Sequence, residues 1–292
     1  MNLKEQQPAL TIKAQIENLK SLNLIINDEK FAESFLEDVS YYRLVKAFSI
    51  GLKPKNKSYY ENVTFEQLTE LYLFNVKFRQ ILLSQIETIE INLRCRISNY
   101  FCLKYGVLGY KDSINFANSK YHNDFLTEIN TEINRNKRMP FIYNFKNNYV
   151  DGEIPFYALV EIMSFGTLSK FFKNMLNQDK KEVAKKYNVG YSYLESWIEC
   201  ISFVRNICAH YGRLYQVRLT KKPKLYKQYT EINISNSYIF GVLCCIKHLI
   251  KIDENWISFV NRIDTLFNKY KFVNKIELGF PDNWKNILLN NK

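Results

Sequence analysis

The segment FVRNICAHYGRLY, residues 203–215, gathers side chains suited to acid–base and phosphate chemistry at the end of an apolar helical pattern. Asn206 and His210 are four positions apart, so both lie on one side of a helix. Arg205 points toward the apolar flank of that helix, where a guanidinium is costly to bury unless a partner or a cleft receives it. We therefore expect Arg205 to line a groove between helices or to pair with a carboxylate.

These side chain types could cut RNA without a metal ion or another cofactor. A histidine exchanges protons near neutral pH, so one imidazole can take the proton of a ribose 2′-hydroxyl while another donates to the departing 5′-oxygen. A guanidinium such as that of Arg205 can hold the phosphate as its charge develops. The alternative is that His210 only caps carbonyls at a helix end and the arginines contact carboxylates.

The net charge of +12 is concentrated around this motif. Residues 1–165 carry 20 basic and 19 acidic side chains, whereas residues 166–228 carry 13 basic and 4 acidic ones. Such a segment suits a polyanion, and nucleic acid is the commonest one. The predicted RNA-binding residues are Arg213, Arg218, Lys221, Lys222, Lys224, Lys185 and Lys186. Alternatively, the lysines between positions 180 and 186 form the solvated face of a helix.

The composition indicates an all-α protein, because only 9 Gly and 6 Pro punctuate 292 residues. Two short helices are expected over 11–22 and 28–39, with Thr11 and Asp28 as N-caps. The segment 40–60 fits a short strand or an irregular turn. A capping box of Thr64 and Gln67 predicts the start of a long helix that continues toward Gly106.

The second half contains a loop-rich region and several further helices. Residues 106–155 hold most of the loops and one helix near 121–135. After Pro155 we expect a helix, a bend at Gly166 and a second helix, followed by a lysine-rich helix over 179–187. Ser192 and Glu195 form a second capping box, and the helix they start should end at Gly212. Two more helices are expected over 235–251 and 253–270.

Other candidate sites are weaker. Cys244, Cys245 and His248 share one helix, but three ligands without a fourth nearby favour core packing over a metal site. Glu87 and Glu90, on the long helix, could neutralise Arg205 or orient His210, and a solvated position fits both equally well. The six cysteines show no CxxC spacing, and no secretory or membrane-spanning segment is evident, so a cytoplasmic protein is expected.

RNICAHYGRLY resembles the most recognisable stretch of the Abi-like family, the bacterial abortive-infection proteins of the AbiD and AbiF type, a branch of the HEPN superfamily. Four other stretches fall in the family's order: SYYRLVKAF (40–48), the run 71–97, IPFYALVEIMSFGTLSKFF (154–172) and GFPDNW (279–284). Phe156 and Tyr215–Gln216 depart from the tryptophan and Trp-Asn that are more usual there. These departures concern substrate detail.

The resemblance implies an HEPN-type helical bundle, here with an N-terminal helical extension (1–60) and a body (61–292) that contains an insertion around 106–155. It further implies that Arg205 and His210, with Asn206 as the polar position after the arginine, form a metal-independent ribonuclease centre. HEPN nucleases usually pair two motifs across a two-fold interface. Because this chain has one motif, the resemblance implies a homodimer.

The same resemblance implies a phage-defence toxin that acts on RNA and is held in check by a bound noncoding RNA. No cofactor is expected. A noncatalytic RNA-binding protein or RNA–protein scaffold is the alternative, and a protein-interaction module is a third reading.

Overall fold

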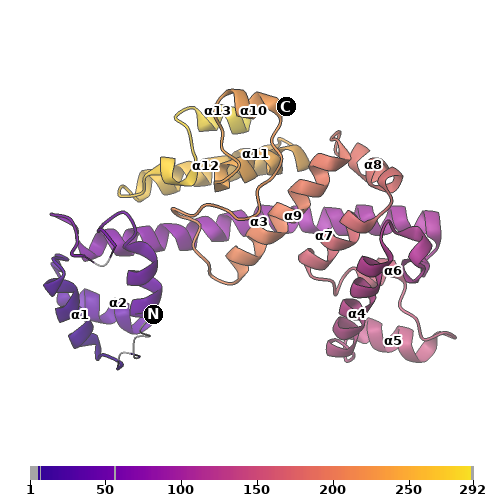
Figure 1. Ribbon diagram of the computed structural model, residues 1–292, viewed down its shortest axis with the longest axis horizontal. Coiled ribbons are helices and arrows are strands. Elements are labelled where there is room, and N and C mark those ends of the chain that lie inside the picture. The colour runs from indigo at the N-terminus through magenta and orange to yellow at the C-terminus, as the bar shows by residue number, and fades with distance from the viewer. Residues whose placement is uncertain (1–5, 7, 56, 291–292) are drawn as a thin grey trace, which may run out of the picture.

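The computed structural model describes residue 6, residues 8–55 and residues 57–290, and within them the protein is helical, with no β-strand (Figure 1). Three isolated bridges, such as Ile25 with Thr64, are the only β pairing in these ranges. The all-α prediction is confirmed.

Helix α3 (Phe65–Tyr105) runs along the whole molecule and organises the rest (Figure 1). Its N-cap is Thr64, whose hydroxyl accepts a hydrogen bond from the Gln67 backbone while the Gln67 side chain accepts one from the Thr64 N–H, as the capping box predicts. The helix is unbroken over 41 residues, because no Gly or Pro interrupts it and apolar residues from Leu68 to Phe101 are buried along it.

The N-terminal part packs around the start of α3. Helices α1 (Ile12–Ser21) and α2 (Glu29–Asp38) pack on each other, and Thr11 and Asp28 cap them as predicted. The segment that the sequence left open forms a π-helical turn, η1 (Tyr42–Lys46), which contacts α3. π-Turns are rare and often occur at functional sites.

The loop-rich region wraps the other end of α3 (Figure 1). It comprises η2 (Gly109–Lys111), η3 (Ser113–Asn115), α4 (Ser119–Arg135) and α5 (Pro140–Asn148), followed by α6 (Phe156–Leu159) and α7 (Phe165–Asn174). An aromatic cluster of Phe101, Phe116, Phe156 and Phe171 joins α3 to these elements.

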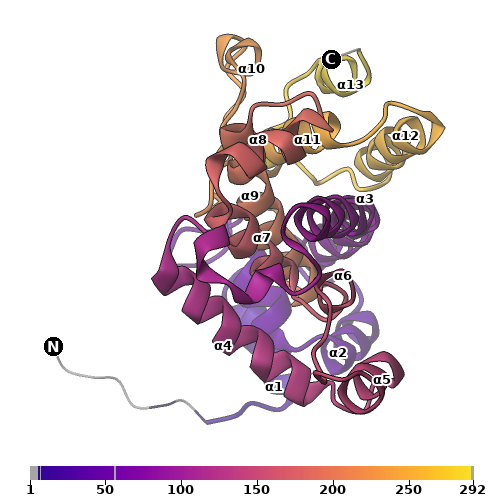
Figure 2. The same cartoon turned by 90° about the vertical axis from the view of Figure 1, so that its right-hand side faces the viewer.

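The remaining helices cover α3 from the opposite side (Figure 2). They are α8 (Asn177–Lys185), α9 (Tyr191–Ala209), α10 (Lys227–Glu231), α11 (Ile239–Leu249), α12 (Glu254–Lys269), η4 (Lys275–Leu278) and α13 (Trp284–Leu289). Helix α9 contacts α3, α7, α8 and α11, so the predicted motif belongs to the most widely connected helix of this layer.

Two predicted helix starts are wrong. Helix α9 begins after Gly190 without a side-chain cap, and Glu195 pairs with Lys180 of α8 at 2.8 Å rather than closing a capping box with Ser192. The expected bend at Gly166 lies earlier: α6 ends at Leu159 and Ser164 caps α7, leaving Gly166 inside its first turn.

Candidate functional site

The motif lies where α9 ends. The last helical residue is Ala209, and the predicted stop at Gly212 is displaced by a short turn in which His210 is the C-cap. The Gly212 N–H donates to the Ile207 carbonyl at 2.7 Å. Tyr211, not Gly212, takes the left-handed conformation with φ 60°, which costs an L-residue about 1 kcal/mol. A β-carbon on Gly212 would lie 2.9 Å from the Ile207 carbonyl oxygen, so close approach explains that glycine.

Two buried side chains of α3 hold this turn. Asn75 donates to the Gly212 carbonyl at 3.3 Å, and its oxygen accepts from the backbone N–H of Leu214 at 2.8 Å. Arg79 donates from Nη1 to the Cys208 carbonyl at 3.0 Å, which satisfies a carbonyl at the end of α9. The position of His210 is therefore set by long-range contacts that no local pattern reveals.

Two of the three predicted catalytic residues are open to solvent and the third is partly covered. Asn206 and His210 are exposed, and the Arg205 side chain is 36% exposed. Within the ranges that the structure describes, neither the Asn206 nor the His210 side chain forms a hydrogen bond. A histidine held by its backbone with both ring nitrogens unengaged can exchange a proton with a ligand.

Arg205 pairs with Glu90, which confirms the expectation of a carboxylate partner. Its Nε lies 3.4 Å from Glu90 Oε2, and the Glu90 side chain is only 11% exposed. The other oxygen of Glu90 pairs with Arg94, which also donates to the carbonyls of Val160 and Met163. Glu90 thus pairs with both arginines, balances one of their two positive charges and holds Arg205 of α9 against α3.

The thiol inside the motif is not a nucleophile. Burial raises the pKa of Cys208 to about 12, with the nearby Arg79 charge opposing part of that change. The thiol therefore stays protonated at neutral pH.

Three residues that are not among the predicted catalytic or RNA-binding residues lie at the turn after His210. Arg43 of η1 donates to the Tyr211 carbonyl at 3.2 Å, and Arg79 lies beside the same turn. Both guanidiniums lie over the Tyr211 ring, at 5.8 and 5.7 Å from its centre. A cavity of about 530 Å³, lined by these three residues, opens there.

The predicted RNA-binding residues do not form one surface. Arg213 is partly buried and donates to the Ala47 carbonyl, so it ties the N-terminal part to the motif. Lys185 pairs with Glu182 at 2.6 Å, and Lys221 pairs with Glu199 at 2.7 Å.

The other members of that set are more open. Lys222 and Lys224 are exposed on the strap that follows α9, and the exposed Arg218 lies 5.7 Å above the Tyr238 ring. Lys224 lies beside Ser196, to which its N–H donates at 2.9 Å. Because Ser196 and His210 are 14 residues apart on α9, this basic strap extends about 20 Å away from the histidine.

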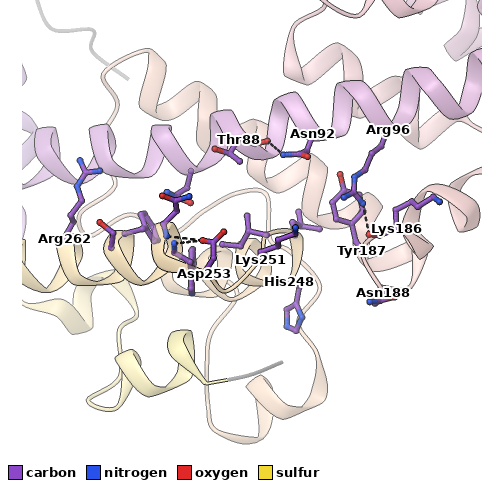
Figure 3. Close-up of a pocket in the computed structure, with 17 residues that line it drawn as sticks. Thr88, Asn92, Arg96, Lys186, Tyr187, Asn188, His248, Lys251, Asp253 and Arg262 are labelled. Carbon is purple, nitrogen blue, oxygen red and sulfur yellow. Dashed lines mark hydrogen bonds between the residues drawn. The ribbon is translucent and has the colours of Figure 1, made fainter.

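Lys186 lines a separate polar cavity of about 680 Å³ between α3 and the start of α12 (Figure 3). Arg96, Lys251 and Arg262 line it with Lys186, and Asp253 is an acidic residue among them. At 100° per residue, Thr88 and Asn92 in its wall point away from the Glu90 side of α3. This cavity is therefore on the far face of α3 from His210.

The cysteine–histidine helix is part of the core. Cys244 and Cys245 are buried, and His248 Nε2 lies 2.9 Å from the Tyr229 hydroxyl. Among the described residues there is no group of three or more His, Cys, Asp or Glu arranged to hold a metal ion. In the same part of the chain, no helix has the length and hydrophobicity needed to span a lipid bilayer.

An all-helical body with an exposed histidine at a helix end, and an arginine five residues earlier on a buried carboxylate, defines the class: a helical protein of the Arg-x4-His type. The family model described as Abi-like protein matches residues 34–216, and the chain belongs to this abortive-infection family. The match covers η1, α3 and α9 and ends just after the turn that follows His210. Comparison with curated proteins gives no match, and neither does comparison with solved structures.

Proposed function

We propose that the protein is a metal-independent endoribonuclease of phage defence, with its centre at the end of α9. The observation that supports this most directly is the exposed, unengaged His210 beside Arg205 and Asn206 in a chain of the Abi-like family. The family supplies the biological setting, and the open histidine supplies a group that can move protons.

The reaction needs three contributions. A base takes the proton of the 2′-hydroxyl, the 2′-oxygen attacks phosphorus, and the bond from phosphorus to the 5′-oxygen breaks as an acid protonates that oxygen. The products are a 2′,3′-cyclic phosphate and a 5′-hydroxyl. In our proposal His210 is the base or the acid, Arg205 neutralises the charge that develops on the phosphate, and Asn206 orients the strand.

A second histidine would come from another copy of the chain, because the sequence holds one such motif. We propose a homodimer that brings two copies of His210 to one phosphate. Its mass in solution should be twice the 34.8 kDa of the chain. Light scattering on the purified protein, with and without RNA, tests this step separately from catalysis.

The proposed control is a bound noncoding RNA that keeps the toxin inactive. The basic strap with Lys222 and Lys224 is open to such a ligand. Sequencing the RNA that accompanies the purified protein identifies it, and its removal should raise the rate of cleavage.

The decisive experiment compares wild type, Arg205→Ala and His210→Ala on labelled RNA with EDTA present. We expect cleavage and 2′,3′-cyclic ends only with wild type, and loss of growth arrest in both variants, while circular dichroism stays unchanged. Cleavage that persists in both variants would refute the assignment.

RNA binding without cleavage is the second candidate function. The Arg205–Glu90 ion pair favours it, because a guanidinium already held by a carboxylate has less to offer a phosphate. In that case binding falls steeply with salt, and prolonged incubation gives no cyclic ends.

A further inference from the structure

Three local features beside the Tyr211 cavity each cost folding free energy. Arg79 is 6% exposed, and the pairs formed within the described ranges give it no carboxylate. Tyr211 keeps a left-handed backbone, although glycine would adopt it without strain. Arg43 sits in a π-helical turn. Such features persist where function requires them.

The charge of this cavity is not balanced by ion pairs. Arg43 and Arg79 each use a donor on a backbone carbonyl, those of Tyr211 and Cys208, and in the described residues neither forms a salt bridge. Nε of Arg79 is buried without a hydrogen-bond partner in those residues. Burial lowers the pKa of Arg79, and the nearby Arg43 acts in the same direction, whereas Cys208, Tyr72 and Tyr211 act to raise it. An anion bound between the two guanidiniums would relieve this repulsion.

One carboxylate borders the cavity. Asp38 at the end of α2 is exposed and lies in its wall, but it forms no ion pair with Arg43 or Arg79. Two arginines against one solvated carboxylate leave the cavity positive. A guanidinium offers parallel N–H groups that match a phosphate.

The size and the aromatic wall of the cavity fit a nucleotide. Its volume of about 530 Å³ falls within the range of roughly 300–1,000 Å³ that small-ligand sites occupy. Tyr211 is 65% exposed, so part of its ring is open to a base although two guanidiniums lie near the ring centre. Stacking on an exposed aromatic ring is how proteins hold unpaired bases.

From this geometry we infer that Arg43, Arg79 and Tyr211 form a nucleotide subsite for single-stranded RNA next to His210, in which the arginines bind a backbone phosphate and Tyr211 stacks a base. The inference rests on the proposed function for its choice of RNA. It adds that the N-terminal part of the chain supplies a phosphate ligand and that the bound nucleotide adjoins the one that is cut. The three are binding residues, and His210 remains the proton carrier.

The test measures RNA binding apart from cleavage. Full-length protein with His210→Ala, which leaves the probe intact, is titrated into a short fluorescein-labelled single-stranded RNA and followed by anisotropy. Adding Arg43→Ala should weaken binding about tenfold and lower the slope of log K against log salt by about one. Arg138→Ala is the matched control, because Arg138 is also exposed but lies between α4 and α5. It should leave the slope unchanged.

Two substitutions of Tyr211 distinguish a role in RNA binding from a role in stability. Tyr211→Phe keeps the ring and should bind as the parent does, whereas Tyr211→Gly should weaken binding roughly tenfold. Glycine also relieves the left-handed backbone, so the unfolding temperature of that variant should not fall. A merely structural tyrosine would instead lose binding and unfolding temperature together.

The outcomes distinguish the two proposals. Equal binding by the Arg43→Ala, Tyr211→Gly and Arg138→Ala proteins overturns the subsite, whether or not wild type cleaves RNA. Weakened binding in the first two, combined with a wild type that never cleaves, leaves the subsite standing and removes the nuclease.

Discussion

Two clusters of arginines lie along the contact between α3 and α9, and they differ in whether a carboxylate pairs with them. Arg205 and Arg94 share the carboxylate of Glu90, whereas Arg79, about 16 Å away along α3, lies buried against a backbone carbonyl with Arg43 nearby. In the first cluster both guanidiniums pair with one nearly buried carboxylate, which balances one of their two positive charges. In the second, neither guanidinium pairs with a carboxylate and both border a cavity, and this difference separates a structural ion network from a surface ready to bind an anion.

The largest expected effect comes from removing the carboxylate that Arg94 and Arg205 share. Glu90→Gln leaves Arg94 and Arg205 without a carboxylate, and Arg94 is itself only 11% exposed. Removing one partner of a nearly buried ion pair should lower the free energy of unfolding by about 3 kcal/mol. Urea denaturation followed by circular dichroism measures it.

Glu87→Gln is the matched control, since Glu87 is exposed on the same helix and forms no ion pair within the described ranges. Equal stability of the two variants would show that Glu90 does not hold the cluster together.

The second-largest effect on stability is expected at the turn after α9 that contains Gly212. Gly212→Ala places a methyl group against the Ile207 carbonyl and the Ile207 side chain, at 2.9 and 2.8 Å. The carbonyl belongs to the last turn of α9 and cannot move freely, so we expect a loss of about 2 kcal/mol and slower RNA cleavage. Gly166→Ala, where the nearest atom is 3.5 Å away, should be neutral. A stable, fully active Gly212→Ala protein would disprove this account of the turn.

The sequence could predict where several helices begin, but not how those helices assemble around the site. Thr11, Asp28, Thr64 and Gln67 predicted real helix starts because capping depends on residues three or four apart. The pairing of Arg205 with a carboxylate also followed from helical geometry together with the cost of burying a charge.

The rest depended on contacts between distant parts of the chain. Arg43 reaches Tyr211 across 168 positions, and Arg79 reaches Cys208 across 129. A π-turn and a left-handed tyrosine have no simple sequence signal. The likeness of SYYRLVKAF to the family was the available hint that residues 40–48 matter, and spacing alone does not connect Arg43 with His210.

A smaller effect on stability is expected at Arg79, which has no carboxylate partner within the described ranges. Arg79→Met removes one hydrogen bond but also the cost of burying an uncompensated charge, so the free energy of unfolding should fall by about 1 kcal/mol or less. Arg94→Met, which removes the ion pair with Glu90, should cost about twice as much. Thermal unfolding of the two variants side by side checks this order, and the reverse order would erase the distinction between the clusters.

The smallest effect concerns Glu199, which holds Lys221 at 2.7 Å and Lys173 at 3.5 Å. The hydrogen bond from Lys221 lowers the pKa of Glu199, and Lys173 adds to the shift. Because the carboxyl is more acidic in the folded protein, its contribution is present at neutral pH and is lost as the pH falls below about 5 through the folded pKa. The pair is well solvated, so that contribution should be small.

Glu199→Gln should therefore change stability little and reduce its dependence on pH below about 5. It also frees Lys221 on the basic strap and Lys173 on α7. The strap, like the cavity, is positively charged, but Glu199 balances part of its charge. RNA affinity should rise about two- to threefold at low salt, and the gain should vanish as salt screens the added charge. Unchanged affinity would mean that RNA does not follow the strap along α9 and that the Arg43–Arg79 cavity is the stronger contact with the strand.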